Sequence, residues 1–318
     1  MFSMVQKRRW FYLFSSCIIV PGIVIMIYSL ITTGTLFHLS NEFVGGSQYE
    51  LKFTAPGATE DNISNVFTSN GNTDLSIQQV GDPSSYQWTV RANFQDQATQ
   101  DAIVAALNKI APLDQSSLDI EQVSATVGQE VTRAAFYAVI LAAVVVTGFI
   151  VLAFRQVPNA LRYGVSAIIA MFHDVFVVAG AESLMGLLFH WEVDALFLTA
   201  VLMVVGFSVQ DTIVLFDRIR ENIPKHLGES YEVIVNRSIL ETIHRSLAIQ
   251  LNVFFIIIAV LLFGGESIKQ FIFILFIGLL TGTYSSIFIA VPLLVSWEKG
   301  EIPFVNRHHA AELKASEA

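Results

Sequence analysis

Residues 195–216 read ALFLTAVLMVVGFSVQDTIVLF, and the only charged side chain among them is Asp211. A helix of about 20 mainly apolar residues crosses the hydrocarbon core of a bilayer. The stretch therefore predicts a membrane-spanning helix that carries one acid. A charged group at such a depth costs about 2.5–3.5 kcal/mol on insertion scales, so an acid there usually serves a function.

Five other segments have the length and composition of a membrane span. The complete set of predicted spans is 10–33, 133–154, 161–189, 195–216, 246–263 and 270–297. The first span is too long for the apolar part of a signal peptide, so we expect an uncleaved anchor. The chain is 53% hydrophobic and 14% charged, whereas soluble domains are about a quarter charged. The sequence thus predicts a polytopic α-helical membrane protein with six transmembrane helices.

Basic residues predict the orientation of these spans, because Lys and Arg collect in cytoplasmic loops. They lie before the first span, after the second, after the fourth and after the last, whereas the remaining short loops are mainly acidic. We therefore expect residues 1–9 and the tail 298–318 to be cytoplasmic. Residues 34–132 would lie on the far side of the membrane, ahead of a five-helix bundle at 133–297.

The region 34–132 has the pattern of a folded α+β domain. Its expected strands and helices, in order, are strand 48–53, helix 59–67 with Thr59 as N-cap, strands 74–80 and 86–93 joined as a hairpin, helix 97–110 and strand 117–123. The order βαββαβ is the ferredoxin-like pattern. From Leu39 to Thr132 there are twelve Asp or Glu and three Lys or Arg, which is typical of a soluble acidic domain.

The sequence does not favour an enzyme or a metal site. His38 is the single histidine of the region 34–132, which has no cysteine and no glycine-rich phosphate loop. The only cysteine of the chain is Cys17. No nucleophile and base are spaced as a catalytic pair. We expect no metal and no organic cofactor.

Asp211 lies in a polar patch of the fourth span, together with Ser208, Gln210 and Thr212. Ser208 shares its helical face because it precedes Asp211 by three residues. The patch favours a protonatable carboxylate that is neutral in one state and ionised in another. A static hydrogen-bonded packing residue is the alternative.

Three other polar groups lie in or near spans. His173 and Asp174 are adjacent in the middle of the third span. The sequence is equally compatible with a role of this pair in a proton path and with a role in helix packing. Arg245 opens the fifth span and forms a polar stripe with Thr242. It could be the positive partner of Asp211 or an anchor at the membrane interface. Glu182, in the third span, is expected near the outer interface.

The remaining motifs are interpreted structurally. Asp217 and Arg218 belong to a charge run at the expected cytoplasmic end of the fourth span, where Arg218 can pair with Glu221. Small residues that would let helices pack closely are Gly264, Gly265, Gly282, Ser285 and Ser286.

Five segments together resemble the SecD/SecF family of bacterial protein-export membrane proteins, on its SecF side. They are Glu42-Phe43-Val44-Gly45-Gly46, His173-Asp174-Val175, the long stretch 206–222, His244-Arg245-Ser246, and Gly282-Thr283-Tyr284-Ser285-Ser286. They run from the first span to the last in the order of the family, and the stretch 206–222 is the most specific.

The resemblance implies a membrane bundle of the RND superfamily that pairs with a SecD-like subunit. It implies use of the proton motive force to promote export through SecYEG, with protons as the coupling ion. Asp211 would be the protonatable acid and Arg245 its basic partner, with His173 and Asp174 as further relay candidates. The expected partners are a translocating preprotein, membrane lipid, and the accessory proteins YajC and YidC, but no nucleic acid.

The chain departs from the family pattern in three places. Glu42 stands where the family usually has Asp, and Gln210 stands where it usually has Asn. The stretch 248–252 lacks the usual Ser and Thr, and we expect the amides of Gln250 and Asn252 to replace those hydroxyls.

Two other functions remain open from the sequence. One is half of an RND-type proton-coupled transporter for small molecules, which would need a large apolar domain with a cleft outside the membrane. The other is a purely structural assembly factor of the translocon, in which neutral substitutions of Asp211 and Arg245 would have no effect.

Overall fold

The computed structural model describes residues 4–72, 75–80, 82–155 and 160–301. The chain forms two compact units. The helical unit consists of Met1–His38, Val139–Trp191 and Leu196–Ala318, and the sheet unit of Leu39–Ala138 with Glu192–Ala195. Parts of the sequence prediction lie outside the described residues: the start of the segment 1–9, the strand start at 74, residue 81 between the two hairpin strands, and the tail from 302 onward.

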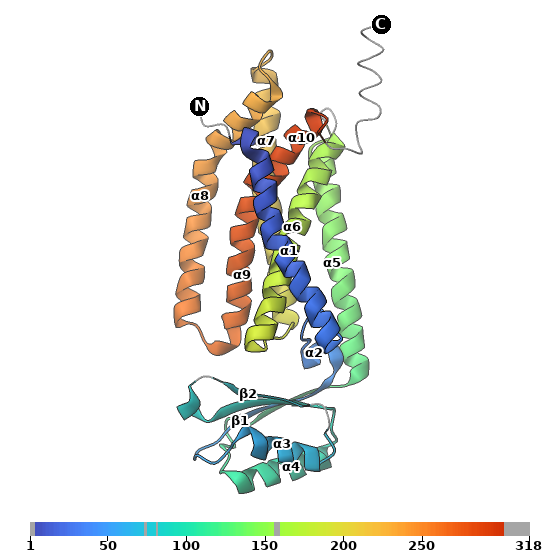
Figure 1. The fold of residues 1–318 in the computed structure, drawn as a ribbon, viewed down its shortest axis with the longest axis vertical. Helices are drawn as coiled ribbons and strands as arrows, with labels where there is room; N and C mark the ends of the chain where they lie inside the picture. The colour runs from blue at the N-terminus through green and yellow to red at the C-terminus, as the bar shows by residue number, and fades with distance from the viewer. Residues whose placement is uncertain (1–3, 73–74, 81, 156–159, 302–318) are drawn as a thin grey trace. The chain divides into compact units, whose positions relative to one another are not determined.

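In the described part of the chain, six helices are long and apolar enough to cross a membrane. They are α1 (Arg8–Thr33, preceded by the turn η1, Val5–Lys7), α5 (Ala125–Ala153), α6 (Ala160–Phe189), α7 (Ala195–Lys225), α8 (Tyr231–Phe263), and the continuous run of α9 (Glu266–Ser285), the π-helical segment η3 (Ser286–Ala290) and α10 (Val291–Glu298) (Figure 1). This confirms the prediction of a polytopic helical membrane protein.

Three helices extend beyond the predicted spans. α5 begins at Ala125 rather than 133, α8 begins at Tyr231 rather than 246, and α7 continues past 216 to Lys225. Hydropathy marks only the apolar part of a helix, whereas polar residues can prolong it on either side. The membrane boundaries themselves stay a prediction.

The interior of the helical unit is formed mainly by α6, α7 and α9 with α10, whereas α5 and α8 are largely exposed. An aromatic cluster fixes one end of this interior: the rings of Phe154 and Tyr163 stack at 5.4 Å, and Phe216 meets Tyr163 edge-on at 5.2 Å. The outer face of α5 carries large apolar side chains such as Phe136, Leu141, Val144 and Phe149. Such a face is suited to lipid or to the helices of a partner.

The backbones of α1 and α6 approach each other at two glycines. A Cβ atom on Gly180 would lie 2.8 Å from Cα of Gly22, and a Cβ on Gly22 would lie 3.2 Å from Cα of Gly180. Membrane helices use small residues in this way to bring their backbones together. The sequence analysis did not single out this pair.

We expect Gly180→Leu to separate α1 from α6, because the new side chain meets backbone that cannot rotate away. Overpacking typically costs about 1–3 kcal/mol, and contact with backbone should place this variant at the upper end. The measurement is thermal aggregation of the purified full-length chain in detergent. Gly148→Leu in α5 is the matched control, because nothing lies within 4 Å of a Cβ there. Equal melting of the two variants would contradict the prediction.

The sheet unit contains four antiparallel strands in the order β2-β3-β1-β4. Its elements are α2 (Asn41–Val44), β1 (Gly46–Lys52), α3 (Glu60–Ser69), β2 (Ser76–Val80), the turn η2 (Pro83–Ser85), β3 (Gln87–Ala92), α4 (Gln97–Ile110) and β4 (Asp119–Val123). Alternate residues of β1 and β3 are buried, including Tyr49, Leu51 and Val90, and pack with α3 and α4 on one face of the sheet (Figure 1). The βαββαβ order predicted for this region is present.

Side-chain caps begin α3 and α4 of the sheet unit. Oγ1 of Thr59 accepts the backbone N–H of Asn62 at 3.3 Å, which confirms the predicted N-cap of α3. Oδ1 of Asp96 accepts the N–H of Thr99 at 3.0 Å at the start of α4. These bonds satisfy N–H groups that have no partner within the helix.

The Phe43-Val44-Gly45-Gly46 motif supplies a backbone turn in the sheet unit that needs glycine. Gly45 has φ +80° and Gly46 has φ +138°, and a Cβ on Gly45 would lie 2.7 Å from Cα of Ala125. Phe43 is buried, and its carbonyl accepts the hydroxyl of Thr132 at 3.1 Å. The two glycines thus let α2 turn into β1 while the start of α5 packs against the turn.

Candidate functional site

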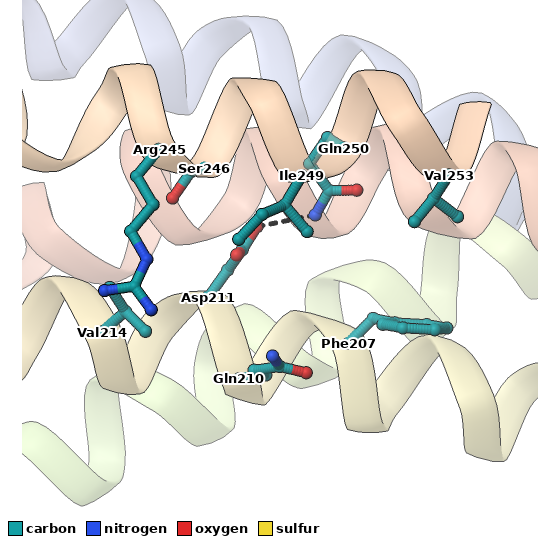
Figure 2. A pocket seen from close by; sticks show the side chains of 9 residues that line it. All are labelled: Phe207, Gln210, Asp211, Val214, Arg245, Ser246, Ile249, Gln250 and Val253. Carbon is teal, nitrogen blue, oxygen red and sulfur yellow. Dashed lines mark hydrogen bonds between the residues drawn. The ribbon is translucent and has the colours of Figure 1, made fainter. Parts of the chain in front are cut away.

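Asp211 lies in a cavity between α7 and α8 (Figure 2). The cavity has a volume of about 80 Å³, which is room for several water molecules. The residues that line it are Phe207, Gln210, Asp211 and Val214 from α7, and Arg245, Ser246, Ile249, Gln250 and Val253 from α8. A buried acid in a small polar cavity inside a membrane helix is a candidate proton site.

The contacts of Asp211 combine burial with one strong donor. Asp211 is 9% exposed, and Nε2 of Gln250 donates to its Oδ2 at 2.8 Å. Arg245 extends from α8 toward α7 in the same cavity, beside Val214 (Figure 2). The structure therefore brings the predicted pair of Asp211 and Arg245 into one cavity. Gln250 provides the hydrogen bond to Asp211, and its replacement of the family's hydroxyls stays a prediction.

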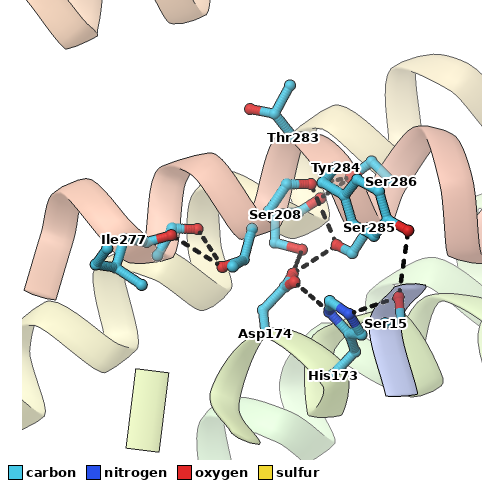
Figure 3. A network of polar contacts seen from close by, with 12 residues as sticks. Ser15, His173, Asp174, Ser208, Ile277, Thr283, Tyr284, Ser285 and Ser286 are labelled. Atoms are coloured by element: carbon cyan, nitrogen blue, oxygen red, sulfur yellow. Dashed lines mark hydrogen bonds and ion pairs between the residues drawn. The ribbon is translucent and has the colours of Figure 1, made fainter. Parts of the chain in front are cut away.

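Asp174 forms the centre of a second buried network (Figure 3). Its side chain is fully buried, and its Oδ2 accepts the hydroxyls of Ser208 at 2.5 Å and Ser285 at 2.7 Å. Its Oδ1 lies 3.0 Å from Nδ1 of His173, whose Nε2 lies 3.1 Å from Oγ of Ser15. One carboxylate thus joins α6 to α7 and α9, and His173 extends the network to α1.

The two polar sites share the polar stretch of α7. Ser208 contacts Asp174 and lies one helical turn from Asp211. Thr212 meets the hydroxyl of Ser286 at 2.9 Å, and Ser286 donates to the carbonyl of Ser208 at 3.1 Å. Gly282 permits this approach, because a Cβ there would lie 3.3 Å from Cβ of Ser208. The sequence identified these residues but not their division between two sites.

The other predicted residues lie away from Asp211. Thr242 is buried and donates to the carbonyl of Ser238 in its own helix. Asp217 pairs with Arg220 at 2.7 Å, and Arg218 pairs with Glu221 at 2.9 Å and with Glu241 at 2.6 Å. Gly264 and Gly265 are the C-cap of α8 and the N-cap of α9, so they form the turn between the two helices.

Glu182 is buried within the helical unit, and its predicted depth near the outer interface stays a prediction. It is 1% exposed, and Nε2 of Gln270 in α9 donates to its Oε1 at 2.7 Å. Gln270 opens the last predicted span as a polar side chain, but nothing in the local sequence pairs it with Glu182. Ser15 and Tyr284, which extend the Asp174 network, gave no comparable signal because isolated hydroxyls are common in membrane helices.

Among the described residues, no group of three or more His, Cys, Asp or Glu side chains could hold a metal ion. The two sites instead combine carboxylates with hydroxyls, amides, Arg245 and His173. The carboxylates can bind and release a proton, whereas the hydroxyls and amides donate and accept hydrogen bonds.

In the part of the chain that the structure describes, six apolar helices with buried acids in their interior and a small α+β sheet unit define a multi-pass membrane protein. A family model described as "Protein export membrane protein SecD/SecF, C-terminal" matches residues 102–300. The chain belongs to the SecD/SecF family and is a protein translocase subunit of that type, consistent with the bacterial inner membrane.

Full-length relatives support this assignment. The chain is 42% identical over 306 residues to "Protein translocase subunit SecF" of Anaerolinea thermophila, covering 95% of this chain and 96% of that protein. It is 38% identical over 325 residues to the SecF subunit of Thermobaculum terrenum, covering 99% and 100%. These relatives are named as translocase subunits, which fits the expectation that the chain is not an enzyme.

Fused relatives point to a SecD partner. The chain is 30% identical over 300 residues to "Protein translocase subunit SecDF" of Bacillus subtilis, covering 93% of this chain and 38% of that protein. The crystal structure of SecDF from Thermus thermophilus matches with a TM-score of 0.75 at 27% identity, covering 94% of this chain and 39% of that one. The chain therefore spans about two fifths of the length of these SecDF proteins, in which a SecD part is covalently joined to the SecF part.

Proposed function

We propose that this chain couples proton movement to protein export, with Asp211 as the protonatable carboxylate and Arg245 as the fixed positive charge of the same cavity. The observation that carries the proposal is the cavity itself. It holds an acid that is 9% exposed, an amide donor 2.8 Å away and an arginine from the facing helix. Arginine stays protonated in any state, so only the acid can switch its charge.

The energy available to such a switch is adequate. One proton gains about 2.3 kcal/mol for each 100 mV of membrane potential. That energy is enough to shift a two-state element whose states differ by a few kcal/mol. The Asp174 and His173 network, which contacts the same helix, would be the further relay.

The sheet unit is the proposed output. Its strand order and its two helices on one face fit a ferredoxin-like domain, and we assign it to the far side of the membrane, with both termini cytoplasmic. There it would engage the emerging preprotein beside SecYEG. A SecD-like subunit would complete the bundle, and YajC and YidC are candidate accessory partners. Protons are the proposed coupling ion, with no organic cofactor.

The test is export of a preprotein into membrane vesicles that contain SecYEG, with and without the complex of this chain and its SecD-like partner. We expect the complex to stimulate export while a proton gradient is present, and an ionophore that collapses the gradient to remove the stimulation. Equal stimulation after collapse would contradict proton coupling. It would favour a structural assembly factor.

A further inference from the structure

The segment Glu192–Ala195 between α6 and α7 belongs to the sheet unit, although the helices on both sides belong to the helical unit. Val193 is 6% exposed and forms a parallel β-bridge with Leu39. The N–H of Ser40 donates to the carbonyl of Val193 at 2.9 Å. The chain between α1 and α2 therefore holds this segment by its backbone.

Arg91 of β3 reinforces the same contact. Its Nη1 lies 2.6 Å from Oε2 of Glu192 and donates to the carbonyl of Leu39 at 2.6 Å. Their side chains are only 26% and 22% exposed, so the pair is less screened than a surface ion pair. Burial raises the pKa of Glu192, and the guanidinium of Arg91 opposes that shift. One arginine thus ties a central strand of the sheet to Leu39 of the bridge and to Glu192, which precedes Val193.

Glu42 holds the other end of the segment. Its Oε2 accepts the backbone N–H of Ala195 at 2.7 Å, and Ala195 is the first residue of α7. The first N–H groups of a helix have no partner within it, and a negative charge there is stabilising. The acid of the Glu42-Phe43-Val44-Gly45-Gly46 motif therefore acts as a cap for a distant helix.

α7 continues without interruption from Ala195 to Lys225 and carries Asp211. About 24 Å of helix separates Ala195 from Asp211 at 1.5 Å per residue. A continuous helix transmits a shift or rotation along its axis with little loss, because its backbone hydrogen bonds keep the rise constant.

We propose that Glu42 and Arg91 are positioning residues that clamp the start of α7 to the sheet unit, so that movement of α7 at Asp211 is passed to the sheet. The clamp is defined as residues 192–195 with Leu39, Glu42 and Arg91. The clamp stays closed throughout the export cycle, because it has to pass the movement of α7 to the sheet at every step. The inference rests on the proposed proton-coupled function.

The test starts from Cys17→Ser, which removes the native thiol. In the complex with the SecD-like partner, Arg91→Met is expected to lower ionophore-sensitive export by about fivefold or more, the lower end of typical coupling strengths. Arg91→Lys should lose less, because it keeps the charge. Adding Leu39→Cys and Val193→Cys to Arg91→Met places two thiols at a β-bridge, within reach of a disulfide. Oxidation should restore export, and a reductant should remove it again.

The matched control is Gln78→Cys with Thr89→Cys in the same Arg91→Met background. These residues are register partners in β2 and β3 and lie outside the clamp. Their disulfide should not restore export. Co-purification with the SecD-like partner is measured for every variant, so that a loss of folding is detected.

Two results would overturn the clamp. One is normal export by Arg91→Met. The other is a block of export when the Leu39→Cys and Val193→Cys disulfide forms beside native Arg91, because a clamp that must open cannot transmit rigidly. Both are read in complexes whose unmodified form shows ionophore-sensitive stimulation. If that form shows none, the proposed function itself fails, whatever the state of the clamp.

Discussion

Asp211→Asn is expected to assemble normally and to lose all ionophore-sensitive stimulation of export. Asparagine has the size of aspartate, and its carbonyl oxygen can still accept the hydrogen bond that Gln250 donates to Oδ2. The substitution therefore keeps the packing and the principal contact of the cavity and removes only the ability to gain and lose a proton. A purely structural residue would tolerate the change.

The matched control for this substitution is Asp217→Asn, six residues further along α7. Asp217 forms an exposed pair with Arg220, and such surface pairs contribute about 0–1 kcal/mol. Export should be unchanged in this control. Asp211→Glu should retain part of the stimulation, because a carboxylate remains in the cavity. Full stimulation by an assembled Asp211→Asn complex would rule out Asp211 as the coupling acid.

Asp174→Leu is expected to weaken the helical unit markedly. The substitution removes the acceptor for the hydroxyls of Ser208 and Ser285 and for the ring of His173, all of which are buried. Each buried donor that loses its acceptor costs about 1–3 kcal/mol. Ser285 can turn to the carbonyl of Gly282, which lies 3.2 Å away, so the largest cost falls on Ser208. Thermal aggregation of the full-length chain in detergent measures the loss.

Asp174→Asn separates a relay from a packing role. The amide keeps one oxygen acceptor but cannot ionise, so a packing role predicts mild destabilisation with normal export. A relay predicts strongly reduced export at nearly normal stability. Thr283→Val is the control for a lost hydroxyl in α9, because the hydroxyl of Thr283 donates to the carbonyl of Leu279 in its own helix and lies outside the Asp174 network. Wild-type melting of Asp174→Leu would show that the network is not stabilising.

Much of the site was predictable because lipid makes polar residues conspicuous. Asp211, Asp174 and His173 interrupt long apolar runs, and an intramembrane acid demands a partner. The sequence also singled out Gln250 as a polar residue of α8, although not as the partner of Asp211. The sequence placed Glu182 near the end of a span but did not identify the side chain that contacts it. Its partner Gln270 comes from a distant helix, so local sequence could not reveal the burial.

The sequence by itself determined the six spans, the βαββαβ order and the acids, because the period of apolar residues and the cost of charge in lipid act locally along the chain. Only the tertiary structure decided which acid meets which partner. It placed the amide of Gln250 against Asp211 and the hydroxyl of Ser208 against Asp174. It also brought Arg91 to Glu192, and Glu42 to the first residue of α7. Those contacts join residues far apart in the chain. They depend on the backbone approach of helices and strands, which residue spacing does not encode.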